Sequence, residues 1–246
     1  MSSQPGIWLA AWTILQRNPS AGLAYVAAMM VIGVLQDHMN SGSGLAIAQA
    51  FAAAFLAIPA HLSVPKNVDV GLKLKDAGAD KAIVPFVLRG LGLGILAGIV
   101  PLIVLVVMLV RTEGEPSIGF LVFGILAIVT FALVFAKWGT MLPATVVGGD
   151  KRFTAAGARA SRCFGYAFPR LLVSFGLLGV ATAGTVLLFG MFADSSTFSS
   201  DAGIGSVVTS LLFNGLGAYQ IAMTAVILSR AYLMAEEKTA AQPVAA

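Results

Sequence analysis

The sequence predicts an all-α, polytopic integral membrane helix bundle of about six transmembrane helices, with both termini on the cytoplasmic side. Composition is the first reason. Hydrophobic residues make up 58% of the 246 residues and charged residues only 11%, and the mean hydropathy is +0.91. A soluble domain carries about 25% charged residues. The second reason is that lysine and arginine gather on one side of the apolar segments.

Six stretches approach the ~20 apolar residues that a helix needs to cross the hydrocarbon core of a bilayer. They are continuously apolar rather than alternating, which favours helices over barrel strands. Pro19 and Pro116 suit the first turn of a helix. The predicted spans are 19–36, 43–62, 85–110, 116–136, 169–192 and 206–229.

Charge in the connections predicts the orientation. Of the 15 lysine and arginine residues, all but Arg111 lie in the terminal segments or in the connections 66–89 and 137–170. The remaining connections carry Asp37, Glu113, Glu115, Asp194 and Asp201. The positive-inside rule therefore predicts cytoplasmic N- and C-termini. Anionic headgroups explain the basic pI, so no nucleic-acid partner is expected.

Three regions follow from these spans: an interfacial segment over 1–18, a transmembrane domain over 19–235 and a disordered tail over 236–246. The tail is rich in alanine and polar residues. The first segment places Trp8, Trp12 and Leu15 on one helical face, which is typical of a helix lying in the membrane interface. The alternative is a loosely attached extension of the first span.

A second interfacial helix is expected over 153–164. Phe153, Ala156, Ala160 and Phe164 recur at helical spacing there, and three arginines lie off that line. Such a helix would rest on the inner leaflet.

A weak internal repeat appears when the sequence is shifted by 84 residues. The shift aligns Phe51 with Phe135, Pro59 with Pro143 and Pro85 with Pro169. It predicts parallel copies over 43–110 and 116–192, related by an axis along the membrane normal. The alternative is chance matching in a chain rich in alanine, glycine and leucine.

Small residues mark one face of the third span. Gly90, Gly94 and Gly98 repeat every four residues, which lets the backbone of a second helix approach closely. The prediction is a helix-packing face, and the alternative is the lining of a ligand site.

Polar side chains within the spans are the candidate ligand-binding residues: Gln49, Asn214 and Gln220. Hydrogen bonding between helices is the alternative role. No ionisable residue falls near the middle of a span, which argues against proton relays and charge-coupled transport. No catalytic or metal-binding motif is present, and Cys163 lacks a histidine partner in sequence. The sequence therefore predicts no catalytic residue, no bound metal and no cofactor.

Basic residues of the two long cytoplasmic connections are the predicted contacts with lipid headgroups. These residues are Lys73, Lys75, Arg152, Arg159 and Arg162. Membrane lipids are the expected partners, together with another membrane protein or a second copy of the chain.

Two segments carry a resemblance to a known group. They are 138–162, WGTMLPATVVGGDKRFTAAGARASR, and 56–66, LAIPAHLSVPK. A span that ends in Pro-Ala, followed by a polar turn and a small amphipathic helix, resembles a broad group of bacterial membrane proteins. That group includes the membrane domain fused to some glycerophosphodiester phosphodiesterases. The resemblance implies a six-helix inner-membrane protein without established catalysis, and it transfers no functional residue.

The function predicted from sequence is a non-enzymatic scaffold or accessory component that contacts anionic lipid at its cytoplasmic face. The alternative is a transporter or permease-like protein for a small or amphiphilic solute, without a charged coupling residue inside the membrane.

Overall fold

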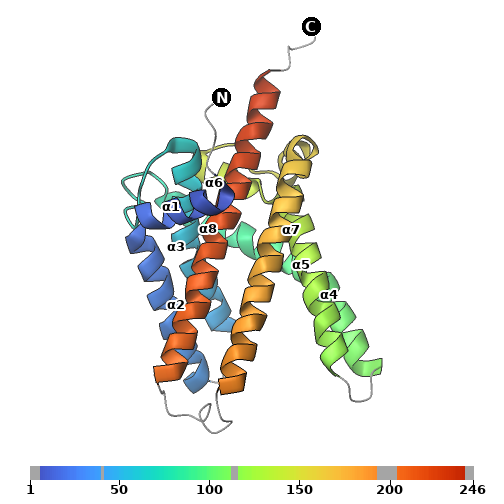
Figure 1. Cartoon of the computed structure of the whole chain (residues 1–246). Helices are drawn as coiled ribbons and strands as arrows, with labels where there is room; N and C mark the ends of the chain where they lie inside the picture. Colours follow the sequence, from blue (N-terminus) through green and yellow to red (C-terminus); the bar gives the residue numbers. More distant parts are fainter. Residues whose placement is uncertain (1–5, 40–41, 112–115, 193–203, 242–246) are drawn as a thin grey trace.

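The computed structural model describes residues 6–39, 42–111, 116–192 and 204–241, and all regular structure in them is helical. Six helices are long and apolar enough to cross a membrane, so the chain is a multi-pass bundle and the predicted fold class is confirmed (Figure 1). The long helices are α2 (Pro19–Met39), α3 (Gly42–Lys66), α4 (Ile83–Arg111), α5 (Pro116–Trp138), α7 (Phe153–Phe192) and α8 (Ile204–Ala240).

Five of the long helices form a ring. Each of α3, α4, α5, α7 and α8 contacts the next, and α8 contacts α3 again. Helix α2 packs outside the ring against α3 and α8. The ends of α4 and α5 far from the chain termini lean away from α7 (Figure 1). Residues of this ring line the cavity described below.

Short helices lie at the end of the bundle where α8 reaches Ala240. Helix α1 (Ile7–Arg17) runs across the long helices and contacts α8 (Figure 1). Helix α6 (Met141–Val147) is almost wholly buried and contacts α3, α4 and α8. A 3₁₀ turn, η1 (Asp80–Ala82), precedes α4.

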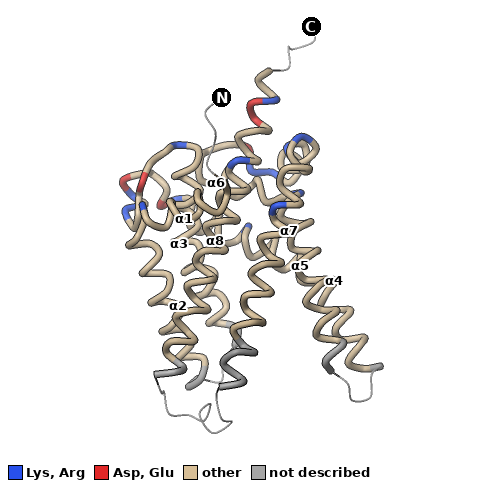
Figure 2. The backbone as a smooth tube through the Cα atoms, viewed as in Figure 1, with Lys and Arg blue, Asp and Glu red and all other residues tan. Residues whose placement is uncertain are grey.

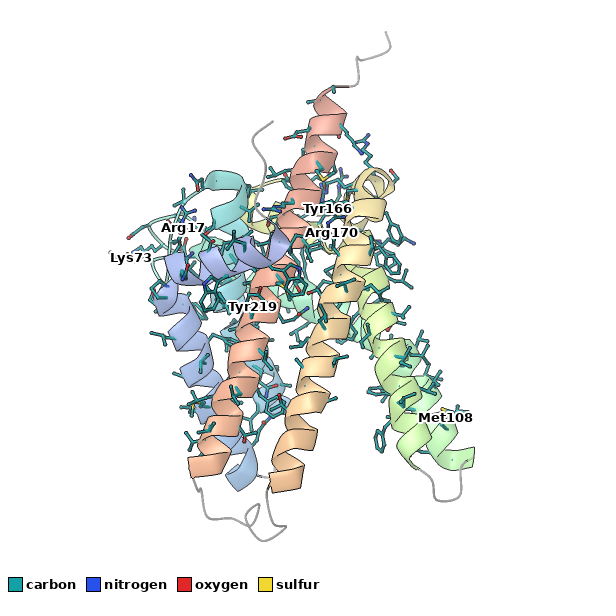
Figure 3. The ribbon with its side chains drawn as sticks, in the orientation of Figure 1. Arg17, Lys73, Met108, Tyr166, Arg170 and Tyr219 are labelled. Carbon is teal, nitrogen blue, oxygen red and sulfur yellow. The ribbon has the colours of Figure 1, made fainter. Side chains whose placement is uncertain are left out.

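Charged residues gather at this same end of the bundle, as Figure 2 shows. Arg17, Lys73 and Arg170 lie there, whereas Met108 lies toward the opposite end of α4 (Figure 3). Because the number of spans is even, the two ends of the transmembrane domain share one side. The acidic residues predicted on the other side fall in connections outside the described residues or at their margins.

Two predicted boundaries are wrong. The segment 153–164 is no separate interfacial helix, because α7 runs unbroken from Phe153 through Pro169. Small buried residues on one face explain this continuity: Ala156, Ala160, Cys163 and Ala167 pack inward and lead to Leu171. At the C-terminal end, residues 236–240 belong to α8 rather than to a disordered tail. Residues 242–246 lie outside the described part.

The proposed repeat units follow the same order of elements but differ in detail. Pro59 lies inside the continuous helix α3, whereas Pro143 lies in α6, after a break that follows α5. Gly139 occupies that break. A Cβ at Gly139 would lie 2.8 Å from a methyl carbon of Leu228 and against the carbonyl oxygen of Phe135. The break therefore depends on a residue without a side chain.

Candidate functional site

A cavity of about 550 Å³ lies within the ring of helices. Helices α3, α4, α5, α6, α7 and α8 all contribute to its walls. This volume falls within the range of small-molecule sites. Apart from the polar residues treated below, its lining consists of Ala50, Ala53, Ala54, Ala57, Phe86, Val87, Gly90, Leu91, Gly94, Ile95, Phe131, Phe135, Leu142, Phe175, Ile221 and Ala225.

Small side chains on two facing helices create this space. Alanines at 50, 53, 54 and 57 of α3 share one helical face. On α4, a Cβ placed at Gly90 or Gly94 would meet no atom within 4 Å. Larger side chains at these positions would occupy the cavity.

Phenylalanines form one wall of the cavity. The rings of Phe131 and Phe135 stack with centroids 6.1 Å apart, and Phe175 of α7 meets both edge-on at 6.2 Å. These contacts join α5 to α7. The resulting surface suits an apolar or aromatic group.

Three polar residues line the cavity: His61, Gln220 and Thr224. Gln220 is 6% exposed. Its Oε1 accepts a hydrogen bond from the hydroxyl of Ser174 over 3.1 Å, and its Nε2 donates to Thr224 Oγ1 over 3.4 Å. Gln220 is thus held in place between α7 and α8.

His61 is 2% exposed, and its Nδ1 lies 2.8 Å from the hydroxyl oxygen of Ser229 on α8. Its ring packs edge-on against Phe86 with a centroid distance of 5.6 Å. Nε2, the other ring nitrogen of His61, has no hydrogen-bond partner among the described residues.

The three polar residues predicted from sequence lie apart. Gln220 lines the cavity. Asn214 is half-buried and donates to Ser210 Oγ over 3.4 Å, within its own helix. Gln49 is half-buried on α3 and is not among the lining residues. Of the sequence candidates, the structure brings only Gln220 to the cavity.

Sequence reasoning missed His61 and Thr224. The signal for His61 was the stripe of small residues at 50, 53, 54 and 57, because position 61 continues it at helical spacing. Thr224 lies one turn beyond Gln220 on α8. A search for polar residues on small-residue faces would have found both.

The glycine face of α4 is not packed against a neighbouring helix within the described structure. A Cβ at Gly98 also meets nothing within 4 Å. The face of α4 that meets α5 instead contains Leu93 and Ala97, both fully buried, and Thr130 of α5 donates to the carbonyl oxygen of Ala97 over 2.9 Å. Gly90 and Gly94 therefore make space for the cavity.

Arg159 does not face lipid headgroups, contrary to the sequence prediction. Its side chain is 6% exposed. It donates to the carbonyl oxygen of Asp150 over 2.7 Å and to Thr140 Oγ1 over 3.3 Å, and it pairs with Glu236 at 3.5 Å. The guanidinium also lies 5.2 Å from the ring centre of Tyr232. Arg159 thus joins α7 to α8 and to the connections around α6.

The other predicted headgroup residues are more accessible. Lys73 and Lys75 are exposed in the connection between α3 and η1. Arg152 is exposed and pairs with Asp150 at 2.6 Å, and hydrogen bonds from Arg152 lower the pKa of the Asp150 carboxyl to about 2. Arg162 is half-buried and donates to Thr239 Oγ1.

Charged side chains and clusters of metal ligands are absent from the described lining of the cavity. None of its described lining residues is Asp, Glu, Lys or Arg. In the part of the chain that the structure describes, no three His, Cys, Asp or Glu side chains gather as a metal site would require. The arrangement can solvate an apolar body and offer a few hydrogen bonds.

The comparisons with known proteins add no relative to this geometry. No protein-family model matches the chain, and no curated protein or solved structure is significantly similar to it. The functional argument therefore starts from the cavity itself.

Proposed function

We propose that this multi-pass protein binds a small, uncharged, largely apolar or amphiphilic solute inside its helix bundle and moves it across the membrane in a permease-like manner. The carrying observation is the cavity lined by α3, α4, α5, α6, α7 and α8, with Gln220 and His61 on its wall. We place the protein in the inner membrane of a bacterial cell, with both termini cytoplasmic.

The walls select the chemical class of the solute. They are mainly alanine, glycine and phenylalanine, with the polar side chains of His61, Gln220 and Thr224. A charged group would lose its hydration here without meeting an opposite charge, which costs several kcal/mol. A neutral solute with one or two hydrogen-bonding groups meets no such cost.

A non-catalytic role is part of this proposal. His61 and Ser229 lie 2.8 Å apart, a distance typical of a nucleophile and its base. Ser229 is fully buried, however, and it is not among the residues that line the cavity. Its hydroxyl cannot reach a solute held there, so we assign to Ser229 the role of orienting the His61 ring.

A scaffold or accessory role is the second candidate. It is favoured by the exposed lysines Lys73 and Lys75 and by the crosswise helix α1, which offers contacts to an anionic leaflet. A partner membrane protein that copurifies in mild detergent, without a bound solute, would favour this candidate.

Matched glycine variants test the permease-like proposal. Gly94→Leu fills the cavity, whereas Gly92→Leu places the same side chain on an exposed position of the same helix. Neither position has an atom within 4 Å of a new Cβ, so both variants should fold. Each protein is purified in mild detergent, and its small molecules are extracted and identified by mass spectrometry.

We expect a neutral amphiphile to copurify with the wild-type chain and with Gly92→Leu but not with Gly94→Leu. Proteoliposomes loaded with that compound should lose it faster when they contain wild-type protein than when they contain Gly94→Leu. Equal recovery from the two variants, or equal efflux, would reject the proposal.

A further inference from the structure

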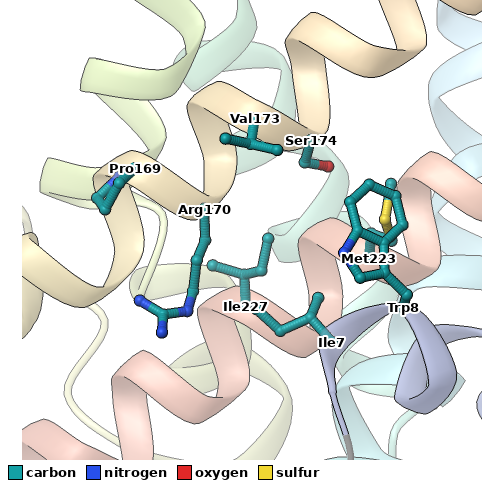
Figure 4. Close-up of a pocket in the computed structure, with 8 residues that line it drawn as sticks. All are labelled: Ile7, Trp8, Pro169, Arg170, Val173, Ser174, Met223 and Ile227. Atoms are coloured by element: carbon teal, nitrogen blue, oxygen red, sulfur yellow. The ribbon is translucent and has the colours of Figure 1, made fainter.

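A second hollow lies on the outer side of the bundle, between α1, α7 and α8. Its volume is about 330 Å³, and we call it the outer groove. Figure 4 shows its lining, with Arg170 at one end and mainly apolar side chains along the rest. The lining residues are Ile7, Trp8, Pro169, Arg170, Val173, Ser174, Met223 and Ile227.

Arg170 is the charged member of this lining. Its guanidinium lies 4.2 Å from the ring centre of Tyr166, and Nη1 donates to the carbonyl oxygen of Tyr166 over 3.0 Å. Among the described residues, no carboxylate lies within ion-pairing distance of it. Because a guanidinium has five N–H donors, most remain available to a planar anion such as a phosphate.

The rim formed by α1 is fixed to the bundle. Tyr219 of α8 donates from its hydroxyl to the carbonyl oxygen of Trp8 over 3.0 Å, and the two rings stack at 6.3 Å. The indole of Trp8 remains 45% exposed. Tryptophan with an apolar body and one N–H donor suits the headgroup level of a bilayer.

The outer groove is charged at one end, where Arg170 lies, and apolar toward the other end. Arg170 lies near the end of the bundle where the basic residues gather (Figure 3). One turn further along α7, away from that end, Val173 is 53% exposed, and Met223 lies about one turn from Ile227 on α8. This polarity matches a molecule with an anionic head and an apolar tail.

We propose that the outer groove binds an anionic phospholipid, with its phosphate on the guanidinium of Arg170 and the upper part of an acyl chain against Val173, over a floor formed by the buried side chains of Met223 and Ile227. The site is distinct from the central cavity, since the two share no lining residue. It is also distinct from the headgroup residues predicted from the sequence, because none of those five residues lines the groove.

Tryptophan fluorescence reports on this site directly. The chain has three tryptophans, so Trp12→Phe with Trp138→Phe leaves Trp8 alone. Trp8→Phe with Trp138→Phe leaves Trp12, which lies on the same helix and is similarly exposed at 51% but does not line the groove. Both proteins are placed in phosphatidylcholine nanodiscs that contain a minor fraction of chain-brominated phosphatidylglycerol or chain-brominated phosphatidylcholine.

Quenching of Trp8 should be stronger with brominated phosphatidylglycerol, and the apparent affinity should favour it about fivefold, which is the effect of one basic residue near a membrane surface. Trp12 should be quenched equally by both lipids. Arg170→Gln should remove the preference at Trp8, and Arg170→Lys should retain part of it. Lys151→Gln, a change of an exposed cation elsewhere, should leave the preference intact.

Two further experiments test whether the phosphatidylglycerol preference requires the acyl chain as well as the phosphate. Soluble glycerol phosphate should not relieve the quenching, because it lacks the acyl chain. Val173→Trp fills the groove while keeping Arg170, and Val173→Leu is its matched control. Because Val173→Trp adds a tryptophan, the phosphatidylglycerol preference of these two variants is followed by native mass spectrometry of bound lipid. An unchanged phosphatidylglycerol preference in Arg170→Gln or Val173→Trp, or an equal preference at Trp12, would overturn the proposal.

Discussion

Ser174 and Gln220 are joined by a hydrogen bond of 3.1 Å, and each lines a different hollow of the molecule. Ser174 lies on the outer groove and Gln220 on the central cavity. The bond connects α7 to α8 at a point where both side chains are buried. The bond therefore lies between the outer groove and the central cavity.

The Ser174–Gln220 bond should contribute modestly to stability. We expect Ser174→Ala and Gln220→Leu to show a coupling free energy of about 0.6 kcal/mol in a double-mutant cycle, the usual size for hydrogen bonds between membrane helices. Thermal unfolding in detergent measures it. Thr185→Ala serves as the control, because Thr185 donates within its own helix to Ala181. Full additivity of the two changes would contradict the prediction.

Arg159 should matter more than any exposed cation nearby. Arg159→Gln leaves the carbonyl of Asp150 and the hydroxyl of Thr140 without their donor, so we expect a loss of about 2 kcal/mol in the free energy of unfolding. The expected loss of free energy is smaller than for a fully buried ion pair, because Glu236 is 47% exposed. Arg152→Gln should change stability by at most about 0.5 kcal/mol. Equal effects of the two changes would refute this assignment.

Acid should weaken the connection between α6 and α7. The pKa of Asp150 is lowered from 3.8 to about 2 by its hydrogen bonds with Arg152, so the folded protein binds this proton less readily than the unfolded chain. The stabilisation is complete above pH 3.8 and is lost as the pH falls toward 2. Wild-type protein should therefore lose thermal stability relative to Asp150→Asn across that window. Parallel pH profiles of the two proteins would disprove it.

Cysteine labelling tests the orientation. In a Cys163→Ala background, Lys75→Cys occupies an exposed connection that is predicted to be cytoplasmic, so it should react with a membrane-impermeant maleimide only after the membrane is permeabilised. Ser43→Cys, Gly114→Cys and Ser199→Cys should react in intact cells. The reverse pattern would invert the topology, because the even number of spans fixes both ends together.

The spans could be predicted from sequence because hydrophobic length is a local property. The first predicted span, 19–36, coincides with the span found in the structure. Boundaries that depend on tertiary packing could not be predicted. Basic residues around 153–164 indicated a surface helix, yet the buried face at Ala156 and Ala160 makes this segment part of α7.

The candidate site was predicted only in part, for a related reason. Gln220 was found because a polar side chain inside a span is conspicuous. Gly94 was interpreted as a packing residue, because sequence cannot distinguish a small residue that admits a helix from one that leaves a cavity. Buried Arg159 was likewise indistinguishable from exposed Arg152, because the burial of Arg159 depends on its packing against α8, which includes Glu236.

Solute binding in the central cavity is tested most directly by titrating N-phenyl-1-naphthylamine, a neutral aromatic probe, into nanodiscs and subtracting the signal of protein-free discs. We predict saturable binding by the wild-type chain and by Gly92→Leu, and at least about tenfold weaker binding by Gly94→Leu, equivalent to about 1.4 kcal/mol. Absence of saturable binding by the wild-type chain, or equal affinities of the two leucine variants, would contradict the account.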